Sequence, residues 1–274
     1  MDLHTVEQVI PASLKEQDAR DWQEGDAWLG GGTWLFSAEQ PHLRRLRDLM
    51  VMPSDPPILE DDRGLTVRST CTIAELDRYP ISHTAWPAAC LIGQCCHSFL
   101  AGFKILNAAT VGGNICMSLP AGPMISLCVA LDGVYTLRSW DGVVRTVAAL
   151  DFTTGDHQNI LAPGELLQSI HLPALGLQRT VAMRRFSLVK DGRSSVLVIG
   201  SHDPGTGSFA LTITAATSRP VQLRFPVVPQ KEELRHALAD QIEESLWFDD
   251  PNGTPEHRRH LTAVFAEDLR TRLA

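Results

Sequence analysis

Two glycine-rich stretches contain the residues best suited to binding a ligand. The first, WLGGGTWLF at 28–36, has consecutive glycines followed by Thr33. The second, TVGGN, occupies 110–114. Because glycine has no Cβ, its backbone can approach a ligand closely, and successive N–H groups can form a concave site for an anion. Two such turns that face each other would be able to hold a pyrophosphate.

Neither stretch matches the best-known phosphate-binding patterns. The string GxxxxGK[ST] is absent, and neither stretch reads GxGxxG with an acidic residue about twenty positions later. For an isolated pair of glycines, a tight turn with close packing is the commoner explanation. The glycines alone therefore leave both interpretations open.

The remaining polar residues do not indicate nucleophilic, acid–base or metal chemistry. No nucleophile–base pair or pair of carboxylates stands out. We interpret His83 and His97 as surface or packing residues, and Asp151 and Asp156 as loop or cap residues. The cysteines form no CxxC pair and fit no iron–sulfur ligand spacing, so we expect reduced, buried thiols at Cys71, Cys90, Cys95, Cys96, Cys116 and Cys128.

Length and charge narrow the class of protein. The chain has 274 residues, which suffices for one large domain or two medium ones, and its formal net charge is −8. An acidic chain with a pI near 5.7 is a poor candidate for non-specific binding to nucleic acid or to an anionic membrane. No run of eighteen apolar residues occurs, and the first residues lack a signal-peptide core, so we expect a cytoplasmic protein.

The N-terminal part mixes short strands with helices. A helix is expected at 12–22, a second one directly after the first glycines, and a third at 72–76, where Thr72 and Glu75 fit a capping box. The other expected elements are strands at 27–29, 46–52, 64–70 and 163–173, helical segments at 86–103, interrupted by Gly93, and at 122–133, and a hairpin around Asp141-Gly142.

The pattern changes at about residue 178. Four strand-like segments follow one another and predict an antiparallel sheet, and two helices come after them. The last helix is expected to begin with Thr254 as N-cap and Pro255 at N1. Its apolar face is expected to consist of Leu261, Val264, Phe265, Leu269 and Leu273. We therefore expect an α+β fold with a boundary at 173–178, which gives domains at 1–175 and 176–274.

Several motifs together resemble one protein family. The first glycine stretch looks like the AGGT-x-L loop of the FAD-binding subunit of molybdenum hydroxylases of the xanthine dehydrogenase and carbon monoxide dehydrogenase type. The stretch NAATVGGN at 107–114 is similar to the second flavin loop of that family, N-x-x-TIGGN. The segments DGVVRTVAALDFTTG, LAPGELLQSIHLP and the C-terminal DDPNGTPEHRRHLTAVFAEDLRTRL resemble further family segments in the same order. The resemblance covers nearly the whole chain.

The resemblance implies a fold and a set of cofactor contacts. The fold would be the two-subdomain FAD-binding fold of vanillyl-alcohol oxidase-like proteins, followed by a small C-terminal domain of antiparallel strands and helices. The glycine turns would grip the pyrophosphate of FAD, Leu161 would lie near the adenine, and Arg185 would reach the flavin nucleotide. The implied residues of the two loops are Gly30, Gly31, Gly32, Thr33 and Trp34, and Thr110, Val111, Gly112, Gly113 and Asn114.

Four positions depart from the family pattern. Leu106 stands where the family usually has Arg, and Trp34 occupies a slot for Asp, Glu or Ser. Pro123 and Arg193 each stand where Asp is usual. A site built from backbone N–H groups tolerates such changes, but the side-chain contacts to the adenosine are left without an assigned replacement.

The resemblance implies an FAD-carrying, electron-transferring oxidoreductase subunit of a molybdenum hydroxylase. [2Fe-2S] clusters and the molybdopterin cofactor would then reside in a small iron–sulfur subunit and a large molybdopterin subunit, in a heterotrimer or its dimer. One alternative is a stand-alone FAD oxidase of the same fold, although about 95 residues after the boundary are few for a substrate-capping domain. Another is a structural subunit that has lost FAD, which the departures at Leu106, Pro123 and Arg193 motivate.

Overall fold

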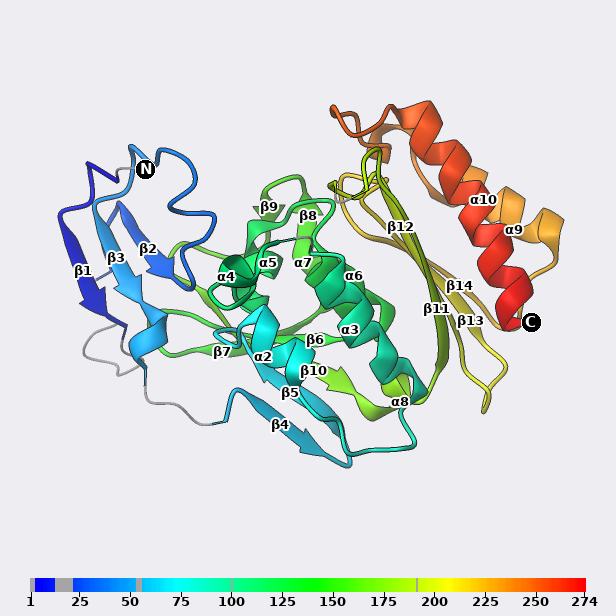
Figure 1. Cartoon of the computed structure of the whole chain (residues 1–274), viewed down its shortest axis with the longest axis horizontal. Helices are drawn as coiled ribbons and strands as arrows, with labels where there is room; N and C mark the ends of the chain where they lie inside the picture. The colour runs from blue at the N-terminus through cyan, green and yellow to red at the C-terminus, as the bar shows by residue number, and fades with distance from the viewer. Residues whose placement is uncertain (1–2, 13–21, 53–55, 100, 191) are drawn as a thin grey trace.

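The computed structural model describes residues 3–12, 22–52, 56–99, 101–190 and 192–274. The helix expected at 12–22 falls mainly on 13–21, outside the described residues. Helices and strands are mixed throughout (Figure 1), as the α+β prediction requires. In the described part of the chain, no helix combines the length and the apolar character needed to cross a membrane.

A small parallel sheet lies at the N-terminal end. Its middle strand β3 (Arg45–Asp48) pairs on one side with β1 (Gln8–Pro11) and on the other with β2 (Asp26–Leu29). The 3-10 helix η1 (Leu49–Val51) follows β3, so the strand expected at 46–52 ends early. Residues 33–37 form a turn rather than the expected helix.

A five-stranded antiparallel sheet forms the centre of the molecule in the order β4-β5-β10-β6-β7 (Figure 1). The hairpin predicted around Asp141-Gly142 is confirmed, and Gly142 has φ +89°, which that turn requires. The strands of this sheet are β4 (Ile58–Asp61), β5 (Gly64–Arg68), β6 (Val134–Arg138), β7 (Val144–Ala148) and β10 (Leu166–Pro173), and the short pair β8 (Thr153–Gly155) and β9 (Gln158–Asn159) lies apart from it.

Short helices pack beside this sheet. The predicted capping box of Thr72 and Glu75 is present at the start of α2 (Ile73–Arg78). Contrary to expectation, Gly93 does not interrupt its helix, α3 (Cys90–His97). All residues of α6 (Pro123–Ala130) are buried, because α6 lies between α3 and the C-terminal sheet. The other short helices are η2 (Pro87–Ala89), α4 (Phe103–Leu106), α5 (Val111–Met117), α7 (Ala149–Phe152) and α8 (Ala174–Leu177).

The predicted C-terminal antiparallel sheet is confirmed in the order β11-β12-β13-β14. In Figure 1 the helices α9 (Lys231–Gln241) and α10 (Pro255–Leu273) lie on its outer face, and α6 approaches it from the opposite side. Its strands are β11 (Thr180–Phe186), β12 (Val196–His202), β13 (Phe209–Thr214) and β14 (Val221–Phe225), and η3 (Glu244–Leu246) connects the two helices.

The last helix begins as predicted, and most of its predicted apolar face is confirmed, because Leu269 and Leu273 are buried and Leu261 and Phe265 pack against the C-terminal apolar cluster. Thr254 caps α10 by accepting from the N–H of His257, and Pro255 stands at N1. Val264, assigned to the apolar face, is 49% exposed. Arg258 is buried beside this face, and its guanidinium pairs with the carboxylate of Asp250 and donates to the carbonyl oxygens of Ser195 at 2.8 Å and Gly253 at 2.9 Å. The carboxylate and the two carbonyls together satisfy a charged group that the predicted apolar face did not include.

Candidate ligand-binding site

The first glycine stretch presents backbone N–H groups that are not used within the protein. It follows the end of β2, so the strand fixes where the glycines begin. Among the described residues, the N–H groups of Gly31, Gly32 and Thr33 have no hydrogen-bond acceptor. Gly32 has φ +68°, which favours glycine at the point where the chain turns. A run of unpaired N–H groups of this kind can receive the oxygens of an anion.

The second glycine stretch differs, because its N–H groups are already engaged. Thr110 is the N-cap of α5, and its Oγ1 accepts from the N–H of Gly113 at 3.0 Å. The N–H of Val111 donates to the carbonyl of Cys71, and that of Gly112 to the carbonyl of Ser69. The N–H of Asn114 donates back to the carbonyl of Thr110 within the first helical turn. The expectation that both stretches offer free N–H groups therefore fits the first stretch only.

The two stretches are in direct contact. A Cβ on Gly31 would overlap the backbone carbonyl of Ala108, which lies two residues before Thr110. A Cβ on Gly30 would lie 3.1 Å from Oγ1 of Thr110. Gly31 is thus needed for close packing of backbone on backbone, which is the interpretation that the sequence left open beside ligand binding. The same contact brings the two stretches to one place.

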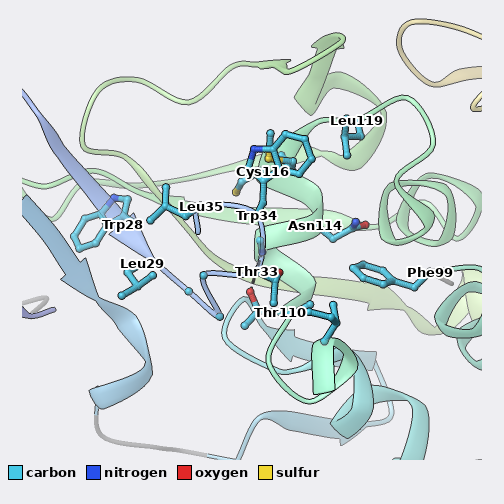
Figure 2. Close-up of a pocket in the computed structure, with 17 residues that line it drawn as sticks. Trp28, Leu29, Thr33, Trp34, Leu35, Phe99, Thr110, Asn114, Cys116 and Leu119 are labelled. Atoms are coloured by element: carbon cyan, nitrogen blue, oxygen red, sulfur yellow. Dashed lines mark hydrogen bonds between the residues drawn. The ribbon is translucent and has the colours of Figure 1, made fainter. Parts of the chain in front are cut away.

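A cavity of about 410 Å³ opens between the two stretches (Figure 2). Its size lies within the range of small-molecule and cofactor sites. In the described structure, no Asp or Glu lines this cavity, so nothing there opposes an anion by charge. The predicted site residues that line it are Gly30, Gly31, Gly32, Thr33, Trp34, Thr110, Gly113 and Asn114.

Polar side chains add donors to the wall of this cavity. Oδ1 of Asn114 accepts from the N–H of Met124 at 3.1 Å, which fixes the amide and leaves its Nδ2 without an acceptor among the described residues. Figure 2 shows Asn114, Thr33 and Thr110 around the same space. The hydroxyl of Thr33 likewise makes no hydrogen bond within the described structure, so it is available to a ligand.

The apolar wall consists of residues that the sequence did not single out. Trp28 lines the cavity from the end of β2, and its Nε1 donates to the carbonyl of Gly164 at 3.3 Å. The ring centroid of Trp34 lies 5.6 Å from that of His157. Burial raises the pKa of the Cys116 thiol to about 12, so this lining residue is an unreactive apolar contact. The lining residues that were missed are Trp28, Leu29, Leu35, Phe99, Ile105, Ala109, Cys116, Met117 and Leu119.

One signal in the sequence would have found some of these residues. Trp28 and Leu29 immediately precede the glycines on the strand, and Cys116 and Met117 lie one helical turn after Gly113. Neighbours at such spacings share a surface with the glycines. Phe99 and Leu119 reach the cavity from segments whose position only the folded chain defines.

A second cavity of about 120 Å³ adjoins the same glycines and contains Leu161. It is lined by Gly112 and Gly113 on one side and by Leu161 on the other. The N–H of Leu161 donates to Oδ1 of Asn159, and Nδ2 of Asn159 donates to the carbonyl of Cys116 at 2.9 Å. Asn159 thus ties the Leu161 segment to the end of α5.

Glu165 anchors the other end of the Leu161 segment. Its carboxylate accepts from Nε of Arg145 at 2.7 Å and from the N–H of Ala162 at 3.0 Å. The Arg145 guanidinium lowers the pKa of Glu165 against the opposing effect of burial, and the Ala162 N–H adds to the lowering. The carboxylate is therefore held in its charged form as a structural clamp of the second cavity.

Two predicted site residues have other surroundings. The side chain of Val111 is 2% exposed and belongs to the apolar core. Arg185 lies on β11, where its Nε donates to Oγ of Ser194 at 2.7 Å and its Nη2 donates to the carbonyl of Gly192. Arg185 lines neither cavity.

The departures from the family pattern are accommodated locally. Pro123 stands at N1 of α6, where its missing N–H costs nothing. Nη1 of Arg193 lies 3.9 Å from Oδ2 of Asp250. Leu106 packs against the main apolar core. None of these three residues lines the larger cavity.

Comparisons with known proteins identify the family of this chain. A model of the family described as "FAD binding domain in molybdopterin dehydrogenase" matches residues 6–175, well over half of the chain. Aldehyde oxidase 2 of Cavia porcellus is 28% identical over 60% of this chain but only 13% of its own length. A putative xanthine dehydrogenase FAD-binding subunit of Escherichia coli (strain K12) is 29% identical over 53% of this chain and 49% of its own length.

Solved structures show the same fold over the whole chain. A chain of the reconstituted CO dehydrogenase from Oligotropha carboxidovorans has a TM-score of 0.80 at 22% identity, with 100% of both chains covered. A chain of quinoline 2-oxidoreductase from Pseudomonas putida 86 has a TM-score of 0.77 at 19% identity, with 97% of this chain and 95% of that chain covered. By its match over residues 6–175, the chain belongs to the family of FAD-binding domains of molybdopterin dehydrogenases.

Proposed function

We propose that this chain binds FAD without a covalent link and acts as the electron-transfer subunit of a multi-subunit molybdenum hydroxylase. The observation that carries the proposal is the facing of the two glycine stretches across one cavity. The first stretch supplies unpaired N–H groups, and the second lacks a Cβ at Gly113, where a side chain would enter the cavity. Family membership makes FAD the expected ligand.

The residues present fit a pyrophosphate-containing cofactor. The N–H groups of Gly31, Gly32 and Thr33 would hold phosphate oxygens, and Nδ2 of Asn114 would add a donor from the opposite side. The indole of Trp28 borders both cavities and would cover an apolar part of the cofactor. Leu161 would contact the end that reaches the smaller cavity. Bound FAD would accept and pass on electrons, while the protein sets its position and excludes water.

The other subunits of the assembly are proposed from the metal sites that the described residues lack and from the name of a relative. Within the described residues, no group of three or more His, Cys, Asp or Glu side chains could hold a metal ion. The relay centres and the substrate-oxidising centre would therefore reside in an iron–sulfur subunit and a molybdopterin subunit. The relative from Escherichia coli is itself named an FAD-binding subunit, which supports this division of labour.

The two-part organisation belongs to the same proposal. Residues 1–175 would form the two-subdomain FAD-binding fold of the vanillyl-alcohol oxidase type, and 176–274 a C-terminal domain. The separate four-stranded sheet with its own apolar cluster under α10 supports a second domain. Arg185 would contribute to the cofactor site only if its side chain left Ser194 and Gly192.

A reconstitution experiment tests this function. The purified chain should release yellow FAD into the supernatant on acid precipitation, and it should not bleach FAD absorbance with purines, aldehydes or azaheterocycles. Addition of iron–sulfur and molybdopterin subunits should restore bleaching by the substrate of the complex. Flavin retained in the pellet would contradict the non-covalent link. Absence of any flavin would favour a structural subunit, and rapid bleaching by the isolated chain would favour a stand-alone oxidase.

A further inference from the structure

A small cavity of mixed polar and apolar lining lies away from the glycine stretches, at one end of the C-terminal sheet. It has a volume of about 100 Å³, and its polar lining consists of Arg179, Ser201, Ser208 and Arg224. Ser201, Ala210 and Arg224 are cross-strand neighbours on β12, β13 and β14. Each polar lining side chain can donate a hydrogen bond, and no carboxylate of the described chain lines the cavity.

Arg179 is poorly satisfied for a largely buried guanidinium. Its side chain is 16% exposed, and its one hydrogen bond within the described structure runs from Nη2 to Oδ2 of Asp132, at 2.5 Å. A guanidinium carries five N–H donors. Nη1 of Arg179 is buried and has no acceptor among the described residues. Burial of charged donors without acceptors is costly, so this site favours an added acceptor.

Arg224 reaches the same place from the far edge of the sheet. Its guanidinium donates to the carboxylate of Asp132, which follows α6, and is about half exposed. Ser201 is buried, and its hydroxyl makes no hydrogen bond within the described structure. Asp132 therefore draws two arginines together and leaves donors of Arg179 and Ser201 unused beside the cavity.

Nearby acids limit the net charge of this cluster. Asp132 pairs with both arginines, and Asp203 is close enough to Arg179 to feel its charge. Asp203 is itself bound mainly by the N–H of Gly205 and the hydroxyl of Thr206. With two arginines and two aspartates, the formal charges cancel. An occupant would thus be held by hydrogen bonds from specific N–H and O–H groups rather than by a net positive charge.

We propose that this cavity is a binding site for a small oxyanion, such as a phosphate group. An oxyanion supplies acceptors for the two guanidiniums and two hydroxyls that line one part of the cavity, while Phe209, Ala210 and Phe225 form the rest of its wall and exclude water from these donors. The volume suits a single tetrahedral group rather than a nucleotide. Its occupant would bridge Arg179, which follows α8, to Ser201 and Arg224 on the sheet. Binding would therefore stabilise the contact between the segment after α8 and the C-terminal sheet.

Thermal unfolding with inorganic phosphate tests this site in the full chain with excess FAD, which keeps phosphate from the glycine stretches. Phosphate should raise Tm saturably, by about 2–4 °C at saturation, and chloride at equal ionic strength should not. Arg224→Gln and Ser201→Ala should remove most of this response. Arg235→Gln, at an exposed ion pair on α9, should keep it.

The outcomes separate the possible occupants. A glycerol phosphate response equal to that of inorganic phosphate would identify the phosphoryl group of a larger metabolite as an acceptable occupant, whereas a response to inorganic phosphate alone would identify the free ion. Equal effects of phosphate and chloride, or a phosphate response that survives in both Arg224→Gln and Ser201→Ala, would overturn the proposal. Because Ser201→Ala alters no charge pair, it keeps the test valid if Arg224→Gln fails to fold. Because Ser201 and Arg224 line neither cavity at the glycine stretches, loss of the response in their variants separates this result from the function proposed there.

Discussion

The two glycine stretches look alike in sequence but differ in the folded chain. In the first, the N–H groups of Gly31, Gly32 and Thr33 have no acceptor within the described structure. In the second, the N–H groups from Val111 to Asn114 all have one, supplied by Thr110 and by the strand end near Ser69. The first stretch therefore offers N–H groups to a ligand. The second is held rigidly by its own hydrogen bonds and leaves space for that ligand.

The glycines within each stretch also differ from one another. Gly31 and Gly112 have no room for a Cβ, because backbone atoms of Ala108 and Ser69 occupy it. At Gly113 a Cβ would meet only Oγ1 of Thr110, at 2.9 Å, and would otherwise project into the cavities. Repeated glycine thus indicates two separate requirements, close packing and access to a ligand, and each position can be tested for either.

The largest effect is expected for Gly31→Ala. Its Cβ would collide with the carbonyl of Ala108, so the two stretches would have to separate, and the free energy of unfolding should fall by about 3 kcal/mol or more. Urea denaturation of the FAD-free chain measures this loss. Gly30→Ala is the matched control, because its Cβ would meet only the Thr110 side chain, at 3.1 Å and 3.9 Å. Equal stability of the two variants would show that the backbone contact is not needed.

Gly113→Ala should separate ligand access from folding. The added methyl group enters the cavity, so the Kd for FAD should rise at least about tenfold, while the Tm of the FAD-free chain should fall only slightly, since the gain in helix propensity offsets part of the 2.9 Å contact with Oγ1 of Thr110. Gly93→Ala in α3 offers the same gain in helix propensity, with its nearest neighbour 3.8 Å away and no contact with either cavity. Its FAD affinity should equal that of the wild type. Unchanged affinity in Gly113→Ala would remove the second stretch from the site.

Asn114→Asp tests the side-chain donor that the second stretch contributes. Aspartate keeps an acceptor for the N–H of Met124 but replaces the free Nδ2 with a negative oxygen facing the proposed phosphates. We expect a roughly fivefold to tenfold rise in the Kd for FAD, with little change in the Tm of the FAD-free chain. Flavin fluorescence titration measures the affinity. A loss of Tm with no change in Kd would instead assign Asn114 a purely structural role.

The smallest effect concerns the wall of the second cavity at Glu165. Because Arg145 lowers the pKa of this carboxyl in the folded state, its stabilising effect is present above the unfolded pKa of about 4.3 and disappears as the pH falls through the lower folded pKa. The Tm of Glu165→Gln should lie below that of the wild type near neutral pH, and the two should converge in acid. Glu232→Gln at the pair with Arg235, where both side chains are 67% exposed, is the control. If the difference in Tm between Glu165→Gln and the wild type stayed constant with pH, the charged form of Glu165 would not be what stabilises this segment.

Local sequence signals determined much of the secondary structure. The capping box at Thr72 and Glu75, the hairpin at Asp141-Gly142 and the start of α10 at Thr254 and Pro255 were all predictable. Each depends on groups within a few residues of one another, so the sequence contains both partners of the interaction. The family motifs likewise indicated that the two glycine stretches meet, because their order along the chain matched that of a family in which both loops bind one cofactor.

Tertiary structure decided how those residues are used. Whether the N–H of Gly112 is free depends on the carbonyl of Ser69, and whether Gly31 tolerates a side chain depends on Ala108. In the same way, the carbonyl of Ser195 and the carboxylate of Asp250 allow Arg258 to be buried, although the apolar periodicity of α10 did not include this residue. Hydrogen-bond satisfaction and steric room are properties of pairs far apart in sequence, so only the folded chain fixes which N–H groups remain for a ligand.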